Sequence, residues 1–90
     1  MTNQQTNQTA MFRNLVEQFQ QSALIFLGEI PNPQTGKISK NLAHAAYFLE
    51  MLQMIKAKTK GNLSAGEEKY LQETVHNLHL PMEKERGGFA

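Results

Sequence analysis

Apolar residues recur at helical spacing in the first third of the chain. Between residues 10 and 27 they gather within roughly 120° of a helical wheel, while polar side chains occupy the other side. This stripe contains Phe12, Leu15, Val16, Phe19, Ala23, Phe26 and Leu27. The pattern predicts an amphipathic helix over 10–27, capped by Thr9 and ended by Gly28 in a left-handed conformation.

Two further stretches show the same period. Residues 40–60 carry a second stripe and end at Gly61, after lysines that suit the negative end of a helix dipole. Residues 65–79 follow a capping box, in which Ser64 and Glu67 bond each other's backbone N–H groups. Because proline cannot continue a regular helix, we expect this third helix to end before Pro81. The second stripe consists of Leu42, Ala45, Phe48, Leu49, Leu52 and Ile55.

These boundaries predict one all-α domain over residues 10–80, a small bundle made of a helical hairpin plus a third helix. Residues 1–9 are almost all Thr, Asn and Gln, and we expect a disordered polar tail there. We also expect residues 81–90 to be a flexible tail. A chain of 90 residues buries too little surface to make a secure monomer, so we expect dimerisation to complete the bundle.

The segment between the first two predicted helices is rich in turn-forming residues. Its two prolines fix their own φ, and its glycine is free to take positive φ, so the segment cannot be helical. We expect an ordered loop whose two ends, Ile30 and Ile38, pack on the core. Since loops often carry function, this loop is a candidate partner-binding surface. Its residues are Ile30, Pro31, Asn32, Pro33, Thr35, Gly36 and Lys37.

The second predicted helix has more apolar surface than one small bundle covers. Tyr47, Met51 and Met54 extend its apolar arc to roughly 240°, and Leu24 and Ile25 interrupt the polar side of the first helix. Monomeric proteins usually avoid exposing such patches. We interpret these five residues as a candidate self-association surface, for which a two-fold dimer is the commonest arrangement. Mutual covering of the two patches inside one monomer is the alternative.

No catalytic constellation is visible in the sequence. The chain has neither cysteine nor aspartate, which excludes thiolate chemistry and a Ser–His–Asp triad. Gly36-Lys37 is similar to the end of a phosphate-binding loop, but Pro31 stands where that motif needs glycine and Ile38 where it needs Ser or Thr. We therefore expect a protein that is not an enzyme and holds no cofactor.

The histidines offer an incomplete set of metal ligands. His76 and His79 stand one helical turn apart, with Glu73 one turn earlier, but a clamp needs a further strong ligand. His44 is the remaining histidine, and nothing in the spacing brings it to the other two. We expect two exposed histidines on the third helix, a partly buried His44 and no metal site.

Charge gives little support for nucleic-acid binding. The net charge of +1 produces no field that would attract a polyanion. Lys37 and Lys40 precede the second predicted helix. The lysines that end it, Lys56, Lys58 and Lys60, are roughly 25–30 Å away. A weak nucleic-acid or ribonucleoprotein accessory role, mainly through phosphate contacts, is the alternative to a self-associating protein-interaction or adaptor module.

Nothing in the sequence indicates export or a membrane role. The polar start lacks the apolar stretch of a signal peptide, and no apolar run approaches the ~20 residues that span a bilayer. We therefore expect a cytoplasmic location.

Two segments carry a resemblance to a known family. One is Gly28-Glu29-Ile30-Pro31-Asn32-Pro33-Gln34-Thr35-Gly36-Lys37, and the other is Lys58-Thr59-Lys60-Gly61-Asn62-Leu63, followed by an acidic helix start. The chain resembles, over roughly residues 12–80, the bacterial family catalogued as domain of unknown function 1844. The resemblance implies a helical bacterial cytoplasmic protein, and it adds no catalytic residues. The end of the third helix, Leu78-His79-Leu80-Pro81, departs from related members, where arginine and further apolar residues are typical.

Overall fold

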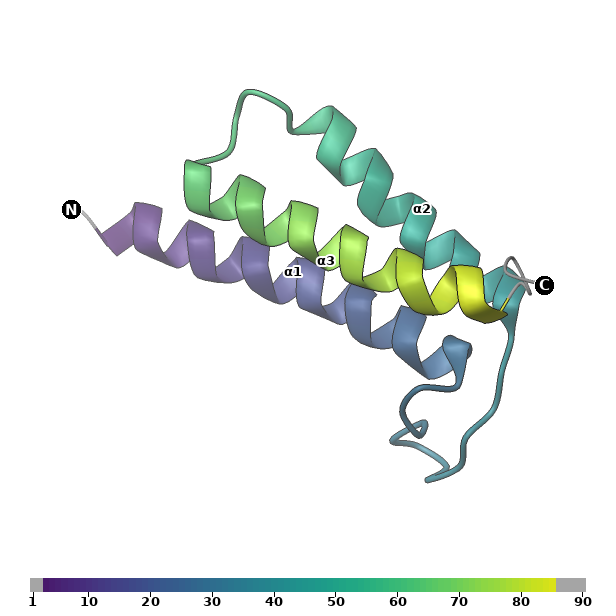
Figure 1. Cartoon of the computed structure of the whole chain (residues 1–90). Helices are drawn as coiled ribbons and strands as arrows, with labels where there is room; N and C mark the ends of the chain where they lie inside the picture. Colours follow the sequence, from purple (N-terminus) through teal and green to yellow (C-terminus); the bar gives the residue numbers. More distant parts are fainter. Residues whose placement is uncertain (1–2, 86–90) are drawn as a thin grey trace.

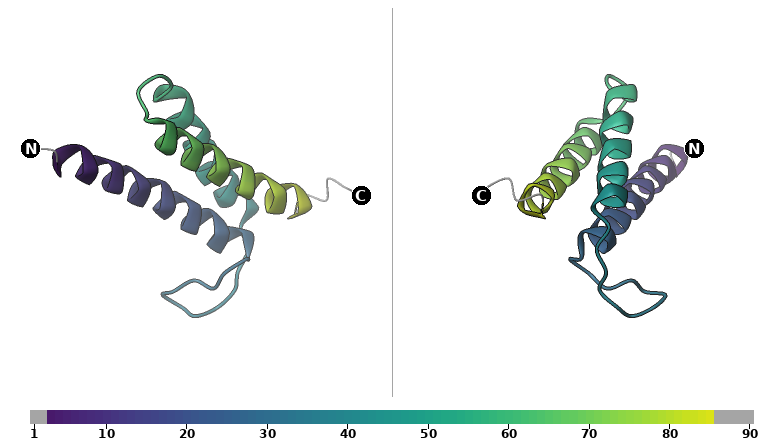
Figure 2. Two further views of the ribbon diagram at one scale, coloured as in Figure 1. Left: turned by 60° about the vertical axis from the view of Figure 1, so that its left-hand side comes forward. Right: turned by 90° about the vertical axis from the view of Figure 1, so that its right-hand side faces the viewer.

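Residues 3–85 form three helices, in the order α1 (Asn3–Leu27), α2 (Leu42–Lys58) and α3 (Ala65–Glu85). The computed structural model describes the backbone of residues 3–85 and the side chains of residues 8–85. Helices α1 and α2 form an antiparallel hairpin (Figure 1). The right-hand view of Figure 2 shows that α3 lies to one side of both. All three pairs of helices are in contact, which confirms the predicted all-α bundle of three helices.

The core lies where the apolar stripes of the three helices meet. Phenylalanine rings join α1 to α2: Phe19 and Phe26 of α1 have ring centroids 6.1 and 5.9 Å from that of Phe48 of α2. The part of the chain that the structure describes contains no helix of the length and apolar character that crossing a membrane requires. The largest fully buried side chains come from every helix: Val16, Leu27, Leu52, Leu71, Leu78 and Met82.

Helix α1 begins earlier than predicted. Residues 3–9, expected as part of a disordered tail, form its first turns and extend beyond the ends of α2 and α3 (Figure 1). Thr9 does not cap the helix, because its hydroxyl donates to Glu67 Oε2 of α3 at 2.9 Å. The stretch contains neither glycine nor proline, so a helix already formed by packing extends through it at little cost. Residues 1–2 lie outside the described residues.

Helix α3 runs through Pro81 to Glu85, so the predicted end before Pro81 is wrong. Proline removes one backbone hydrogen bond and crowds the preceding turn, which costs about 3 kcal/mol in a helix interior. Two contacts beyond it offset this cost. Met82 is 2% exposed in the core, and Lys40 Nζ donates to Glu85 Oε1 at 2.8 Å. The rest of the predicted flexible tail, residues 86–90, lies outside the described residues.

The loop from residue 28 to residue 41 leaves the bundle and returns to it (Figure 1). Gly28 has φ +80°, and a Cβ there would lie 2.8 Å from Lys40 Cγ, so both the conformation and the close approach require glycine. Asn41 N donates to Phe26 O at 2.8 Å and closes the base of the loop. Ile38 is 55% exposed, so the prediction that it packs on the core is wrong. Lys40 and Asn41, rather than Ile38, attach the C-terminal end of the loop to the bundle.

Side-chain and glycine caps set the ends of α2. Asn41 Oδ1 accepts a hydrogen bond from His44 N at 3.1 Å, and α2 begins at the next residue, Leu42. At the other end, Thr59 N donates to Ile55 O, and Gly61 follows with φ +86°. The predicted range of 40–60 is therefore slightly too wide at both ends, because it includes the capping residues.

Replacing Ser64 with alanine is expected to lower the free energy of unfolding by about 1 kcal/mol, the usual contribution of an N-cap side chain. Ser64 Oγ accepts from Glu67 N at 3.1 Å, and Glu67 Oε1 accepts from Ser64 N at 2.9 Å. Urea denaturation measures the change. Ser39→Ala, at an exposed loop serine, is the matched control. An unchanged midpoint for Ser64→Ala would show that α3 does not depend on this cap.

Replacing Pro81 with alanine is expected to raise the free energy of unfolding by up to about 3 kcal/mol. Alanine restores a backbone N–H that can bond to Asn77 O, while Met82 keeps its place in the core. Urea denaturation and far-ultraviolet circular dichroism measure stability and helix content. Leu80→Ala, at a neighbouring side chain that is 60% exposed, is the control. Destabilisation by Pro81→Ala would instead mean that the proline geometry is needed to bury Met82.

Candidate functional site

The five residues predicted to form a self-association surface lie in different environments. Tyr47 and Met54 of α2 are 57% and 47% exposed, and Met51 between them is half-buried. Leu24 of α1 packs against the core, where its own chain covers it. Ile25 is half-buried and lies outside the core cluster. The continuous part of the predicted surface is therefore the α2 patch.

Helix α1 carries an apolar ridge that reaches α2 at its Phe19 end. Met11, Leu15 and Phe19 follow one another at intervals of four residues, so they line up along the helix. Phe19 carries the ridge to α2 through its contact with Phe48. Leu15 is 43% exposed, and its predicted place in the buried stripe is wrong. It lies about 100° around the helix from the fully buried Val16.

Aromatic rings join the α1 ridge to the α2 patch. The Phe26 ring stacks on Phe48, and its centroid is 4.9 Å from that of His44. Tyr47 meets Phe48 edge-on at 5.6 Å. His44 is exposed, contrary to the prediction of partial burial, because it lies against the outer side of Phe26. We name the exposed surface over these rings the open face, formed by Met11, Leu15, Tyr47, Met51 and Met54.

Helix α3 covers the opposite flank of the hairpin. On α1, the guanidinium of Arg13 lies 4.7 Å from the centroid of the Tyr70 ring of α3. On α2, the Gln53 side chain is hydrogen-bonded to His79 of α3 at 2.9 Å. The right-hand view of Figure 2 shows α3 on one side of the hairpin only. The open face lies on the other flank, and within residues 3–85 no fourth helix covers it.

The candidate partner loop has a tip held by its own hydrogen bonds. Asn32 O accepts from Thr35 N at 3.2 Å and from Gly36 N at 2.6 Å, and Asn32 N donates to Lys37 O at 2.9 Å. Asn32 Oδ1 accepts from Gln34 N, and Thr35 Oγ1 accepts from Lys37 N. Gly36 has the positive φ, +72°, that the sequence predicted. The loop is thus a preformed projection at one end of the bundle (Figure 1).

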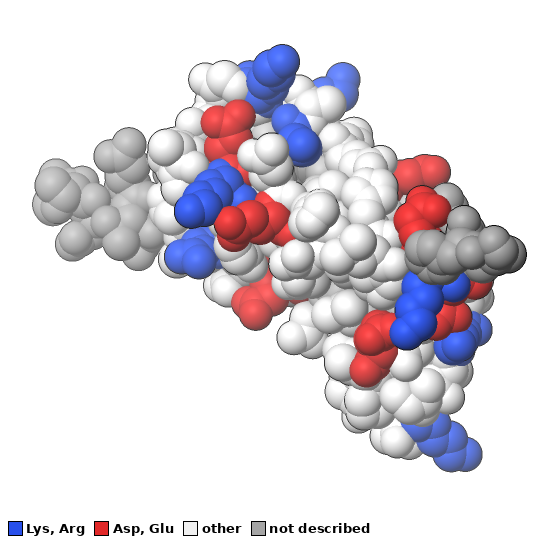
Figure 3. Space-filling model, viewed as in Figure 1, with Lys and Arg blue, Asp and Glu red and all other residues white. Residues whose placement is uncertain are grey.

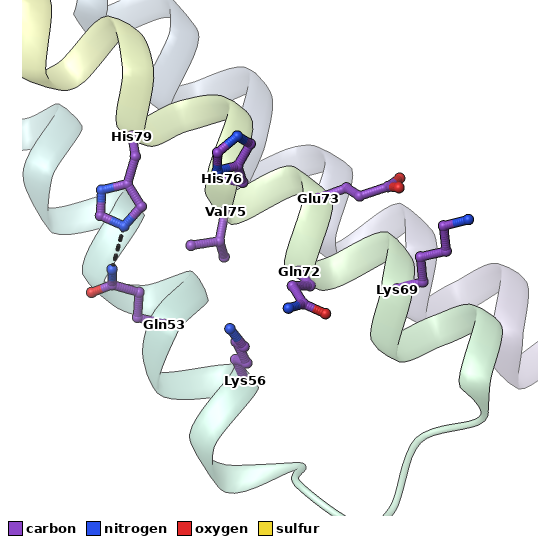
Figure 4. A pocket seen from close by; sticks show the side chains of 8 residues that line it. All are labelled: Gln53, Lys56, Lys69, Gln72, Glu73, Val75, His76 and His79. Atoms are coloured by element: carbon purple, nitrogen blue, oxygen red, sulfur yellow. Dashed lines mark hydrogen bonds between the residues drawn. The ribbon is translucent and has the colours of Figure 1, made fainter.

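The histidines do not converge on one point. Figure 4 shows His76 and His79 along the groove between α2 and α3, with Glu73 on the same helix and His79 directed toward Gln53. His44 lies on the other side of α2, against Phe26. Within residues 8–85, no group of three side chains is placed to hold a metal ion.

The lysines considered for nucleic-acid contact stay apart. Lys40 pairs with Glu85, whereas Lys56 and Lys60 border a cavity at the opposite end of α2. Figure 3 shows acidic and basic side chains interspersed on the α3 side of the molecule, without a continuous basic stripe. On this face of the molecule, the lysines therefore form no phosphate-binding track.

Sequence patterns missed two features. Met11 is 66% exposed and belongs to the open face, although it stands outside the predicted stripe. Its spacing of four residues from Leu15 was the available signal. A cavity of about 340 Å³ between the end of α2 and the start of α3 has no signal in the sequence, because it depends on how far the two helices diverge.

Comparison with known proteins gives one match. A family model described as Domain of unknown function (DUF1844) matches residues 9–82. That range includes most of α1 and α3, all of α2 and the loop between α1 and α2. No curated protein and no solved structure matches the chain.

Glu67 links the start of α3 to Thr9 of α1, and its pKa is lowered from the ordinary value of 4.5. The main cause is the hydrogen bond from Ser64 N, followed by the bond from the Thr9 hydroxyl. Because the pKa is lower in the folded chain, the carboxylate stabilises the fold above its unfolded pKa. This stabilisation is lost as the pH falls through the folded pKa.

Glu67→Gln is therefore expected to destabilise the chain at neutral pH and to lose its effect in acid. Urea denaturation at about pH 7 and about pH 3 measures the difference from the unmodified chain. Thr9→Ala removes one donor to the same carboxylate and is expected to show the same trend with a smaller amplitude. A difference that stays constant across this pH range would contradict the assignment.

Proposed function

The chain belongs to the family described as Domain of unknown function (DUF1844), and from this premise we propose a cytoplasmic, non-enzymatic adaptor that works as a homodimer. The observation that carries the proposal is the open face. Four of its large apolar side chains are between 43% and 66% exposed, over a set of partly buried aromatic rings. Contiguous apolar surface of this kind marks interaction sites in small proteins.

The five side chains that define the open face carry no charge, which favours a second copy as their occupant. Lys58 stands four residues after Met54 and places one charge at the edge of the face. Within α2, Glu50 and Lys56 line cavities on the α3 side. On α1, Arg13 lies over Tyr70 of α3. A two-fold axis brings a surface against itself, so any charge near the axis would meet its own copy. A centre of five uncharged side chains avoids that repulsion, and these side chains offer no cation to a phosphate backbone.

Aromatic residues and methionine suit the centre of such an interface. Tyr47 and the two methionines are among the residue types enriched at protein interfaces. Methionine side chains are flexible and fill irregular gaps between packed surfaces. Two copies of the hairpin packed flank to flank would give each open face the cover that α3 provides on the other side.

The loop between α1 and α2 supports the adaptor half of the proposal. Its tip is preformed, so a partner that binds it would lose little free energy in ordering it. The loop projects from the end of the hairpin, and a dimer would present two copies of it (Figure 1). Two linked binding sites strengthen attachment to a partner that repeats the same motif.

Light scattering coupled to size exclusion, at micromolar protein concentration, tests the dimer directly. The expected mass is twice the chain mass of 10.2 kDa. A mass equal to that of the single chain would end the proposal.

Charge substitutions on the open face are expected to dissociate the dimer. Tyr47→Glu and Met51→Glu each place a carboxylate against its own copy, and Leu15→Glu does the same from the α1 ridge. Gln53→Glu is the matched control, because Gln53 is exposed on the α3 side of α2. Far-ultraviolet circular dichroism separates dissociation from unfolding. A dimer that survives all three open-face variants while Gln53→Glu disrupts it would place the interface elsewhere.

A further inference from the structure

The cavity between the end of α2 and the start of α3 plays no part in the proposed dimer. The two helices diverge before the turn that joins them, at the opposite end of the bundle from the α1–α2 loop (Figure 1). The cavity volume is about 340 Å³. Its lining includes the fully buried Leu71, the half-buried Leu63 and Ala57. Small-molecule sites range over roughly 300–1,000 Å³, so the cavity suits a small ligand.

Lys56 occupies a position where the period of α2 calls for an apolar side chain. Lys56 stands four residues after Leu52 and seven after Leu49, and both spacings return to the same helix face. Both leucines are buried, with exposed fractions of 0% and 6% respectively. Figure 4 shows Lys56 directed into the space between α2 and α3. Because the helices diverge, the exposed Lys56 lines the open cavity. Lys60, one turn later, borders the same cavity.

Among the side chains of residues 8–85, neither lysine at this cavity forms an ion pair, and Lys56, Lys60 and Glu68 together leave the lining with a net positive charge. Glu68 borders the cavity too, but among the side chains of residues 8–85 the one ion pair joins Lys40 to Glu85. Two ammonium groups therefore stand beside an apolar floor without a bonded carboxylate. A ligand with an anionic head and an apolar tail matches both parts of this lining, since the head would form charge-assisted hydrogen bonds with the lysines.

We propose that this cavity binds a small aliphatic carboxylate of medium chain length. The carboxylate pairs with Lys56 and Lys60, and the tail packs against Leu63 and Leu71. Lysine stems also contribute apolar surface along the tail. The site lies between α2 and α3, away from the open face, so it does not depend on dimerisation.

Octanoate is the probe, followed by amide chemical shifts of the isotope-labelled full chain. The amides of Ala57, Leu63 and Leu71 are expected to shift in one saturable step. Octan-1-ol has a similar tail without the charge, and acetate has the charge without the tail. Octan-1-ol is expected to bind about fivefold more weakly than octanoate, because it lacks the two ion pairs. Acetate is expected to bind at least about tenfold more weakly, because it lacks the tail.

Two sets of variants test the two halves of the site. The double variant Lys56→Gln with Lys60→Gln is expected to weaken octanoate binding by about fivefold, as two partly exposed ion pairs would. Lys58→Gln, on the same turn of α2 but outside the cavity lining, is the control and is expected to change nothing. Ala57→Phe fills the cavity from an exposed position and is expected to abolish binding while the chain stays folded.

Three results would each overturn the proposal: equal affinity for octanol and octanoate, unchanged affinity in the double lysine variant, or shifts confined to Tyr47, Met51 and Met54. The last result would assign the probe to the open face. Light scattering of the same samples reports the oligomeric state separately. Failure of the carboxylate site and failure of the dimer are thus read from different measurements.

Discussion

A hairpin of two helices has two flanks, and a single further helix can cover only one of them. In this chain α3 covers the flank marked by the Arg13–Tyr70 and Gln53–His79 contacts. The other flank keeps Tyr47 in contact with solvent, beside rings that join α1 to α2. The open face is therefore a consequence of how many helices residues 3–85 form. Its apolar residues complete no core within one copy.

Contacts at both ends of α3 hold it on its flank. At its start, Glu67 accepts from Thr9 of α1 and closes the capping box with Ser64. At its end, Glu85 pairs with Lys40, which in turn lies against Gly28 at the end of α1. Exposed contacts of this kind each contribute about 1 kcal/mol or less. Their effect is to set the position of α3 along the hairpin, which decides where the α2–α3 groove opens into a cavity.

Helix α2 separates two surfaces of different chemistry. One side carries the uncharged patch around Met51, which suits burial against a like surface. The other side carries Lys56 beside the apolar floor formed by Leu63 and Leu71. A flat apolar patch and a small charged cavity suit different occupants, a protein and a small molecule. The proposed protein role and the proposed ligand site would thus not compete for the same side of α2.

Local signals were enough to determine the stops at Gly28 and Gly61 and the start at Ser64, because each cap is completed within a few residues. The helical period alone likewise revealed Tyr47, Met51 and Met54 as surplus apolar surface. Predictions went wrong where the deciding partner is distant in the chain. Helix α3 passes Pro81 because Met82 reaches the core and Glu85 reaches Lys40.

Contacts with distant parts of the chain also decide which of the remaining apolar residues are buried. Leu24 packs against the core, whereas Leu15 of the same helix is exposed. The sequence pattern of α1 does not indicate which of its sides contacts another helix. The cavity beside Lys56 depends on the angle between α2 and α3. Periodicity determines which face of a helix is apolar. Only the packing of the three helices decides how much of that face is buried, because burial depends on the positions of all three together.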